Sequence, residues 1–337
     1  PGCLDRFADD EIELLGLMSA AANRPMNWNV LTVDSREADR VPRQISAYDR
    51  SIELGGKVVA LTMPVQVPMN MSFSSFCGLW LLPGWQQILG VPLAERIQRL
   101  QDPDTRVRML ENSLSQAAGV FRRLADWGDY VIGDTYSAAN EGLKGRVVRD
   151  VAIERGKSSF GTLLDIVIAD ELKTILWPTP QDDDAESWRM RAELWQDGRA
   201  MIGGSDAGAH LDRMCGAPYP TRWLADCIRG RKLVPVEFAV KMMTSQPAKL
   251  FGLVDRGELR EGACADVVVF NPDEIGSEDA MLVTDLPGNS SRLTAGSFGV
   301  KRVLVNGVTI VENGVANGAV PGTVLKSGKD TYTVLAR

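Results

Sequence analysis

The chain has 337 residues, of which 45% are hydrophobic and 24% are charged, and its formal net charge is −7 at pH 7. This composition is ordinary for a globular protein, and the length predicts about two domains. The acidic balance argues against a nucleic-acid surface, and no apolar stretch reaches the roughly 18 residues that a transmembrane helix needs. We therefore expect neither nucleic acid nor membrane as a partner.

The cysteines and the single histidine further limit the class of protein to which the chain can belong. Five cysteines are scattered without a Cys-x-x-Cys pair, which favours reduced thiols over a disulfide framework. With no basic-then-apolar leader visible, we expect a cytoplasmic protein. His210 is the one histidine, whereas a self-contained binuclear hydrolase site usually needs several imidazoles. Either the protein is not such an enzyme, or another chain completes the site.

The first 63 residues alternate between helical and extended patterns. Apolar spacing predicts helices over 9–22 and 42–54, the second ended by two glycines. Met26–Val33 and Val58–Met63 read as strands, and the near-continuous apolar run of the second suits a parallel strand buried on both faces. The order strand, helix, strand predicts a βα repeat.

Residues 64–92 interrupt this repeat. The stretch is rich in methionine and aromatic residues, including Met69 and Met71, and is broken by prolines and glycines. One interpretation is a hydrophobic plug or an oligomer contact. The other is a lid that grips an apolar substrate group, because methionine and aromatic side chains adapt to irregular ligands.

Helices dominate the middle of the chain. The expected helices cover 93–101, 104–124, 145–154, 160–172 and 185–197. Short strands are expected at 130–132 and at Lys173–Trp177. Three adjacent carboxylates, Asp182 to Asp184, follow the second of these strands, and we interpret them as a solvated acidic turn rather than a cation site.

A short buried strand over Ala200–Gly204 leads into the most informative segment. Ser205 and Asp206 follow the strand, and His210 lies four residues beyond Asp206. A carboxylate at the carboxyl end of a buried strand, with an imidazole just beyond, is how an α/β barrel presents a catalytic or metal-binding pair. The alternative is that Asp206 caps a helix and His210 is a packed polar residue.

In the remaining residues the pattern changes from helical to extended at 255. Helices are expected over 220–228 and 236–243, and a turn with a short helix over 244–253. Short β-runs follow, the first at 257–259, and Asn306-Gly307 is a strong hairpin signal. The sequence thus predicts a domain over 1–254, with an apolar insertion at 64–92, and a small all-β appendage over 255–337.

Several of these segments resemble one family. The motifs are Ile202–His210, Thr244–Leu253, Arg256–Phe270, Val303–Gly307 with Glu312–Gly314, and Leu93–Arg96 with Asp102-Pro103. The chain resembles the C-terminal part of the amidohydrolase superfamily, in its N-acyl-D-amino-acid deacylase (D-aminoacylase-like) branch. The resemblance implies a (β/α)₈ TIM-type barrel with a β-sandwich, the sandwich at 255–337. This chain would hold barrel strands five to eight, at Met26–Val33, Val58–Met63, Lys173–Trp177 and Ala200–Gly204.

Strands one to four of that barrel, and the His-x-His pair that the family places after strand one, have no counterpart in the chain. Half a barrel leaves open edges of unpaired backbone groups. We therefore expect a separate N-terminal half-barrel chain from the same precursor to complete a homo- or hetero-oligomer. The start at Pro1, without methionine, fits a cut precursor; an expressed fragment or removal of an initiator methionine are the alternatives.

The resemblance also implies a function, the metal-dependent hydrolysis of amide C–N bonds in a small molecule such as an N-acyl amino acid. Asp206 would be metal ligand and general acid/base, and His210 would act beside it. The expected substrate-binding residues are Ser205, Gln66, Met69, Met71 and Trp177, with an apolar acyl or aryl pocket.

The metal is expected to be zinc, one ion rather than two, because 31–34 and 62–66 lack the histidines that the family places at the ends of strands five and six. Two alternatives remain open. One is the hydrolysis of a cyclic amide, lactone or carbamate on the same scaffold. The other is a non-catalytic assembly subunit.

Overall fold

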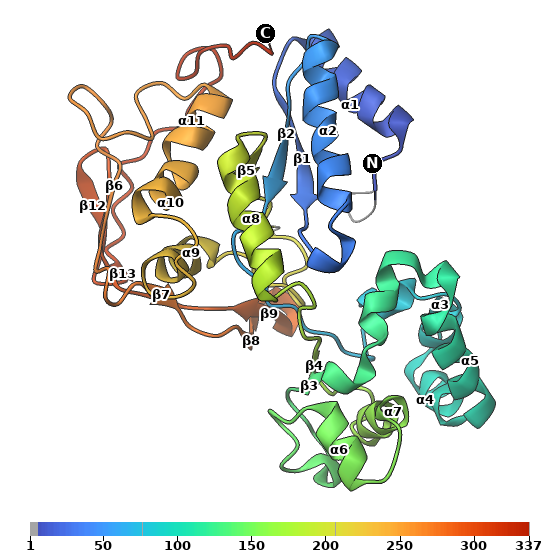
Figure 1. Cartoon of the computed structure of the whole chain (residues 1–337). Coiled ribbons are helices and arrows are strands. Elements are labelled where there is room, and N and C mark those ends of the chain that lie inside the picture. Colours follow the sequence, from blue (N-terminus) through green and yellow to red (C-terminus); the bar gives the residue numbers. More distant parts are fainter. Residues whose placement is uncertain (1–5, 76, 206, 337) are drawn as a thin grey trace. The chain divides into compact units, whose positions relative to one another are not determined.

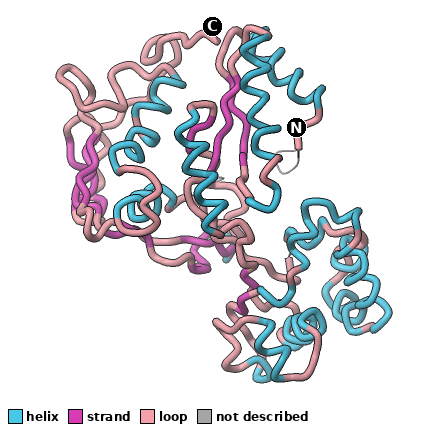
Figure 2. Tube along the Cα trace, in the orientation of Figure 1, coloured by secondary structure: helices cyan, strands magenta, loops and turns pink. Residues whose placement is uncertain are grey.

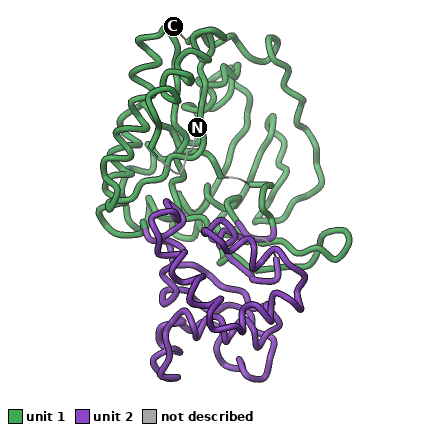
Figure 3. Tube along the Cα trace, turned by 90° about the vertical axis from the view of Figure 1, so that its right-hand side faces the viewer, with its two compact units in different colours: residues 1–67, 182–211, 215–337 green, residues 68–181, 212–214 purple. Residues whose placement is uncertain are grey.

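A computed structural model describes residues 6–75, 77–205 and 207–336. The chain divides into two compact units (Figure 3). Unit 1 comprises Pro1–Val67, Asp182–Leu211 and Cys215–Arg337, and unit 2 comprises Pro68–Gln181 and Asp212–Met214. The chain thus leaves unit 1 after Val67 and returns to it at Asp182.

Unit 1 contains a parallel sheet of three strands in the order β1-β2-β5 (Figure 1). The strands are β1 (Met26–Leu31), β2 (Val58–Thr62) and β5 (Ala200–Ile202). Val58, Ala60 and Ala200 are buried, as expected for parallel strands covered on both faces. The sequence-based prediction of a βα repeat is confirmed here.

Helices α1 (Asp9–Ala22) and α2 (Arg40–Glu53) pack against each other and against β2, while α8 (Ala185–Asp197) packs on β5 (Figure 1). Three acidic residues open α1, where the helix dipole favours negative charge, and Asn23 ends it in the left-handed conformation. Apolar side chains from both helices and from the strands form one core, in which Leu15, Ile45 and Leu31 are buried.

The prediction that 173–177 is a fourth parallel barrel strand is wrong. The observed strand β4 (Leu176–Trp177) pairs antiparallel with β3 (Val131–Ile132), within unit 2. The backbone of Leu176 also exchanges two hydrogen bonds with Met71, at 2.7 and 2.8 Å. These partners satisfy the backbone groups of the strand without the parallel sheet. A segment of five residues with three apolar side chains carries no signal that identifies its pairing partner.

The rest of unit 2 consists of helices and the loops between them (Figure 2). Its α-helices are α3 (Trp85–Leu89), α4 (Leu93–Gln101), α5 (Pro103–Leu114), α6 (Val148–Glu154) and α7 (Ser159–Ala169). Asp102 caps α5 by accepting a hydrogen bond from the Thr105 amide at 2.8 Å. The single helix expected over 104–124 is wrong, because α5 ends at Leu114 and a kinked 3₁₀ segment follows, with Gly119 at φ 51°.

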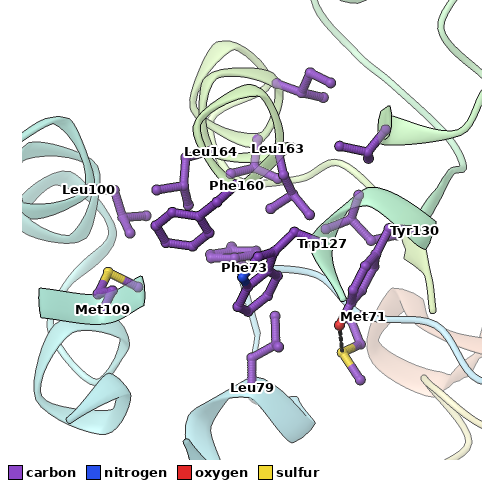
Figure 4. Close-up of a cluster of buried hydrophobic side chains, with 14 of the residues drawn as sticks. Met71, Phe73, Leu79, Leu100, Met109, Trp127, Tyr130, Phe160, Leu163 and Leu164 are labelled. Atoms are coloured by element: carbon purple, nitrogen blue, oxygen red, sulfur yellow. Dashed lines mark hydrogen bonds between the residues drawn. The ribbon is translucent and has the colours of Figure 1, made fainter. Parts of the chain in front are cut away.

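The core of unit 2 is built around stacked aromatic rings (Figure 4). Trp85 and Trp127 stack with ring centroids 5.3 Å apart, and Phe160 tilts against Trp127 at 5.1 Å. Met71 is 1% exposed and accepts a long contact from the Tyr130 hydroxyl at 3.9 Å. The apolar stretch predicted at 64–92 therefore supplies, from Met71 onwards, much of the interior of this unit.

The remainder of unit 1 is three helices followed by antiparallel strands. The helices are α9 (Tyr219–Ile228), α10 (Val236–Met243) and α11 (Ser245–Phe251). A four-stranded sheet, in the order β13-β12-β11-β6, contains β6 (Val267–Phe270), β11 (Val300–Val305), β12 (Val308–Glu312) and β13 (Val315–Ala316). Two further pairs join β7 (Gly276–Ser277) to β10 (Ser297–Phe298), and β8 (Met281–Leu286) to β9 (Ser290–Thr294).

The hairpin predicted from Asn306-Gly307 is confirmed. Both residues have positive φ, 48° and 78°, as a two-residue turn between β11 and β12 requires. The β-run expected at 257–259 is not a strand. The domain boundary at residue 254 and the closure of these strands into a sandwich stay predictions. Among the described residues, no helix combines the length and hydrophobicity that crossing a membrane would take.

Candidate functional site

The carboxyl ends of β1, β2 and β5 meet at one edge of the parallel sheet, the edge at which α/β proteins place their ligand sites. Two hydrogen bonds tie these ends together. The amide of Gly203 donates to the Thr62 carbonyl at 3.0 Å, and the Thr62 hydroxyl donates to the Leu31 carbonyl at 2.9 Å. The turn that follows β5 is therefore fixed to the end of β2, and β2 to the end of β1.

Two close approaches constrain that turn. Gly204 has φ +76°, and a Cβ at this position would collide with the side-chain oxygen of Asn29 in β1. A Cβ on Gly216 would collide with the carbonyl oxygen of Ser205. Because only glycine fits at both positions, the backbone of Ser205 is held tightly against its neighbours. The Ser205 hydroxyl is half-buried and accepts a hydrogen bond from the Ala207 amide at 3.2 Å.

Asp206, the predicted metal ligand and general acid/base, lies outside the described residues. His210 is exposed, with its backbone in the left-handed region at φ 50°. The catalytic roles of both residues and the substrate role of Ser205 stay predictions. What the structure adds is that the segment bearing them starts at the carboxyl edge of the sheet.

Sequence reasoning missed a buried arginine at this edge. Arg191 on α8 is 5% exposed, and its guanidinium donates to the Val33 carbonyl, just after β1, at 3.0 Å. It also pairs with the Asp182 carboxylate and donates to the Asp182 carbonyl at 2.7 Å. Burial lowers the pKa of Arg191, and the negative charges of Asp182 and Asp183 oppose this shift. No local pattern predicts these contacts, because Val33 lies 158 positions away along the chain.

Gln66, predicted as a substrate-binding residue, joins the same group. Its amide nitrogen donates to the Asp182 carboxylate at 3.1 Å and to the Asp182 carbonyl at 3.4 Å. Gln66 lies shortly after the carboxyl end of β2, and Val33 lies shortly after the carboxyl end of β1. The structure therefore places Gln66 at the expected edge of the sheet, with its amide directed at a protein carboxylate.

The acidic loop is more ordered than the predicted solvated turn, since each carboxylate has specific partners. Asp182 pairs with Arg191, while Asp183 accepts from the Trp188 indole at 2.6 Å and from Arg231 at 2.8 Å. Asp184 caps α8 by accepting from the amide and hydroxyl of Ser187. These two hydrogen bonds are the main reason that the pKa of Asp184 falls to about 2. The run of carboxylates organises the start of α8.

The other predicted substrate residues belong to unit 2. Met69 is 37% exposed, Met71 is a core residue, and Trp177 is half-buried with its indole nitrogen against Gly133. The structure thus groups Gln66 and Ser205 in unit 1, and the two methionines with Trp177 in unit 2. The substrate roles of the unit 2 residues stay predictions.

The described residues do not by themselves form a metal site. Within residues 6–75, 77–205 and 207–336, no group of three or more His, Cys, Asp or Glu side chains is arranged to hold an ion. Among the described residues that follow the strands, Asp34 is paired with Arg36, and Asp182, which contacts Gln66, is paired with Arg191. Any resident zinc ion would therefore need ligands beyond this set.

The fold is that of an α/β protein, and the candidate site lies at the carboxyl ends of its parallel strands. Residues 2–311 match the family model described as the amidohydrolase family. Because this match covers most of the chain, the chain belongs to the amidohydrolase family, and the resemblance inferred from its motifs is confirmed.

Known relatives are deacylases. The D-aminoacylase of Alcaligenes xylosoxydans xylosoxydans is 31% identical over 189 residues, which are 54% of this chain and 34% of the relative. The N-acyl-D-glutamate deacylase of the same organism is 36% identical over 115 residues, 32% of this chain and 22% of the relative. The chain thus aligns with about a third of these relatives or less.

Two solved structures are similar to the chain. One is N-acyl-D-glutamate deacylase from Bordetella bronchiseptica complexed with zinc and a phosphonate inhibitor, at 19% identity and a TM-score of 0.47, covering 90% of this chain and 50% of that one. The other is a D-aminoacylase described with a binuclear metal centre, at 20% identity and a TM-score of 0.47, covering 92% and 51%. The chain spans about half the length of both.

Proposed function

We propose that this chain is the part of an amidohydrolase that supplies Asp206, and that the complete enzyme hydrolyses the amide C–N bond of N-acylated D-amino acids. The observation that carries the proposal is the family match over residues 2–311, which includes the Ser205–His210 segment. The segment's start at the carboxyl edge of a parallel sheet supports it, since that edge is where such folds place their chemistry. The deacylase names of the relatives supply the substrate class.

The proposed roles follow from the chemistry of the side chains. A carboxylate at Asp206 takes a proton from the attacking water and delivers one to the leaving nitrogen. His210, four residues further, stabilises the oxyanion or holds the substrate. Ser205 and Gln66 lie at the edge where a substrate would bind, and Met69 and Trp177 are the candidates for contact with an apolar acyl group.

We further propose that zinc, as one ion, belongs to the complete enzyme. Support for zinc comes from the zinc complex of one solved relative, and the other is described with activation by one metal and attenuation by a second. Since the described residues hold no group of three or more ligands, we assign the zinc ligands to Asp206 and to the N-terminal chain proposed below.

We also propose that a separate N-terminal half-barrel chain from the same precursor completes the fold. In the described sheet β1 and β5 are the outer strands, and each has a hydrogen-bonded neighbour strand on one side only among the described strands. An open edge is a template for pairing with another chain. In its finer form, the proposal is that the barrel strands of this chain lie within residues 1–254 and include β1, β2 and β5.

The test is hydrolysis of N-acetylated D- and L-amino acids by the protein purified with whatever remains bound to it. We expect release of the free D-amino acid, and a fall of kcat by about 10³-fold or more in Asp206→Asn, because a general acid/base group contributes 10²–10⁴-fold. Asp212→Asn, six residues away with an exposed carboxylate, is the matched control and should retain activity. Full activity in Asp206→Asn, or no amide hydrolysis by the wild-type protein, would contradict the proposal.

A further inference from the structure

One buried guanidinium connects segments that are remote in the sequence. From α8, Arg191 donates to the Val33 carbonyl at 3.0 Å and to the Asp182 carbonyl at 2.7 Å, and pairs with the Asp182 carboxylate. Val33 is the second residue after β1. The carboxyl end of β1 is therefore held by a side chain that belongs to a distant part of unit 1 in sequence.

The Asp182 carboxylate is bound from a second side by Gln66, at 3.1 Å from the amide nitrogen. The chain leaves unit 1 after Val67 and returns at Asp182. Gln66 and Asp182 thus stand beside the two points at which the chain crosses between units. We refer to Gln66, Asp182 and Arg191 together as the Arg191 clasp, all of whose members belong to unit 1.

Neighbouring groups fix the orientation of the guanidinium. The guanidinium carbon of Arg191 lies 4.4 Å from the ring centroid of Trp188, and that of Arg231 lies 3.9 Å from it. The Trp188 indole is itself held by Asp183 at 2.6 Å. A planar guanidinium directs several donors in fixed directions, which gives geometric specificity. A buried ion pair is by contrast weak evidence for stability, because desolvation offsets its Coulomb energy.

We propose that Arg191 is a positioning residue for the hydrolase site, because the clasp holds the carboxyl ends of β1 and β2 in the relative placement that a substrate at that edge requires. The catalytic part of this inference rests on the proposed function, and the structural part does not. Arg191 acts through Asp182, Gln66 and the Val33 carbonyl, and is not itself placed against the reacting atoms.

The test exchanges donor and acceptor within the clasp. Gln66→Glu sets two carboxylates against each other, whereas Gln66→Glu combined with Asp182→Asn restores an amide–carboxylate pair with its direction reversed. Arg189→Ala is the matched control, because Arg189 lies on the same helix but pairs with Glu186 and Glu193 at the surface. If Gln66 served only to bind substrate, a second change at Asp182 would leave that defect in place, so rescue by the double variant identifies the clasp.

The first readout is hydrogen exchange of backbone amides over 31–36, 62–67 and 182–185 in the full chain. We expect about tenfold faster exchange in Gln66→Glu, recovery in the double variant and no change in Arg189→Ala, because local opening governs exchange at such segments. Any of three outcomes would overturn the clasp. These are exchange at the wild-type rate in Gln66→Glu, no recovery in the double variant, and faster exchange in Arg189→Ala.

The second readout is kinetic, on the active preparation. We expect kcat to fall about tenfold in Gln66→Glu with KM within about twofold, and to recover in the double variant, since misplacement raises the barrier more than it weakens binding. An unchanged kcat alongside faster exchange would overturn the positioning role. Absence of hydrolysis by the wild-type protein would count against the proposed function. The exchange data would still show whether the clasp holds the ends of β1 and β2.

Discussion

Asp184 shows how single residues of the acidic loop serve the fold. Its carboxylate accepts hydrogen bonds from the Ser187 hydroxyl at 2.6 Å, the Ser187 amide at 2.9 Å and the Ser35 hydroxyl at 3.1 Å. The bonds from Ser187 are the largest cause of the low pKa of Asp184, about 2, whereas an unfolded aspartate titrates near 3.9. A pKa lowered in the folded state means that ionised Asp184 stabilises the fold above about pH 4, and that this contribution is lost as the pH falls toward 2.

The prediction is a pH-dependent difference between the wild-type protein and Asp184→Asn. The urea midpoint of the variant should be lower by a constant amount between pH 5 and 7, and the difference should shrink below about pH 4, where the wild-type carboxylate begins to be protonated. Midpoints measured across this range check it. A difference of constant size down to pH 3 would contradict the assignment.

Asp170 in unit 2 is a buried carboxylate with no cation against it among the described residues. Burial alone would raise its pKa, but hydrogen bonds from Ser137 and Thr174, with help from Asn140, outweigh burial and lower it. The donors lie at 2.7–2.8 Å. We interpret this group as structural, since the contacts of Ser137 and Asn140 tie the loop before α6 to the end of α7, and Thr174 holds the turn that follows α7.

Asp170→Ala would leave these three buried donors without their acceptor. We expect a loss of at least about 2 kcal/mol in the free energy of unfolding, because each unsatisfied buried group costs about 1–3 kcal/mol. Urea denaturation measures it. Lys173→Ala, at an exposed surface ion pair nearby, should stay within about 0.5 kcal/mol of the wild type, and equal losses in the two variants would refute the buried network.

At the scale of elements, helix α7 carries the core of unit 2. Leu163 is fully buried among the aromatic rings of that core (Figure 4). Leu163→Ala should lower the free energy of unfolding by about 2–5 kcal/mol, whereas Leu163→Met, which conserves the volume, should cost less than about 1.5 kcal/mol. The measurement is chemical denaturation of both variants, and a cost below about 1 kcal/mol for alanine would show that this side chain is not packed as described.

The sequence is most informative about elements with local signals. The bounds of α1 and α4 agree with the expected 9–22 and 93–101, because helical apolar spacing is bracketed by breakers. The Asn306-Gly307 hairpin is likewise encoded in two adjacent residues. Pairing partners are not local, which is why the pattern of 173–177 predicts the wrong sheet, and the kink at Gly119 has no periodic signature.

The candidate site likewise has one part that local sequence signals predict and another part that they do not. The segment from Gly203 to His210 can be singled out from residue types and order, because a strand, two glycines and a carboxylate are contiguous. The Arg191 clasp cannot, since its members stand at 66, 182 and 191 and meet only in the fold.

At the scale of the whole molecule, we propose that the chain is one part of a larger enzyme. It belongs to the amidohydrolase family, yet it aligns with about a third or less of the curated deacylases that it matches. Its described residues offer no complete set of metal ligands, and its parallel sheet has two outer strands. Each of these features is explained if a second chain supplies further strands and ligands.

The most direct test is the mass of the purified protein under native and then denaturing conditions, with the metal content of the same sample. We predict a complex that separates on denaturation into this chain and a second polypeptide, with about one zinc ion per pair of chains. A single chain of the mass of these 337 residues alone, stable and free of metal, would contradict the account and favour a non-catalytic fragment.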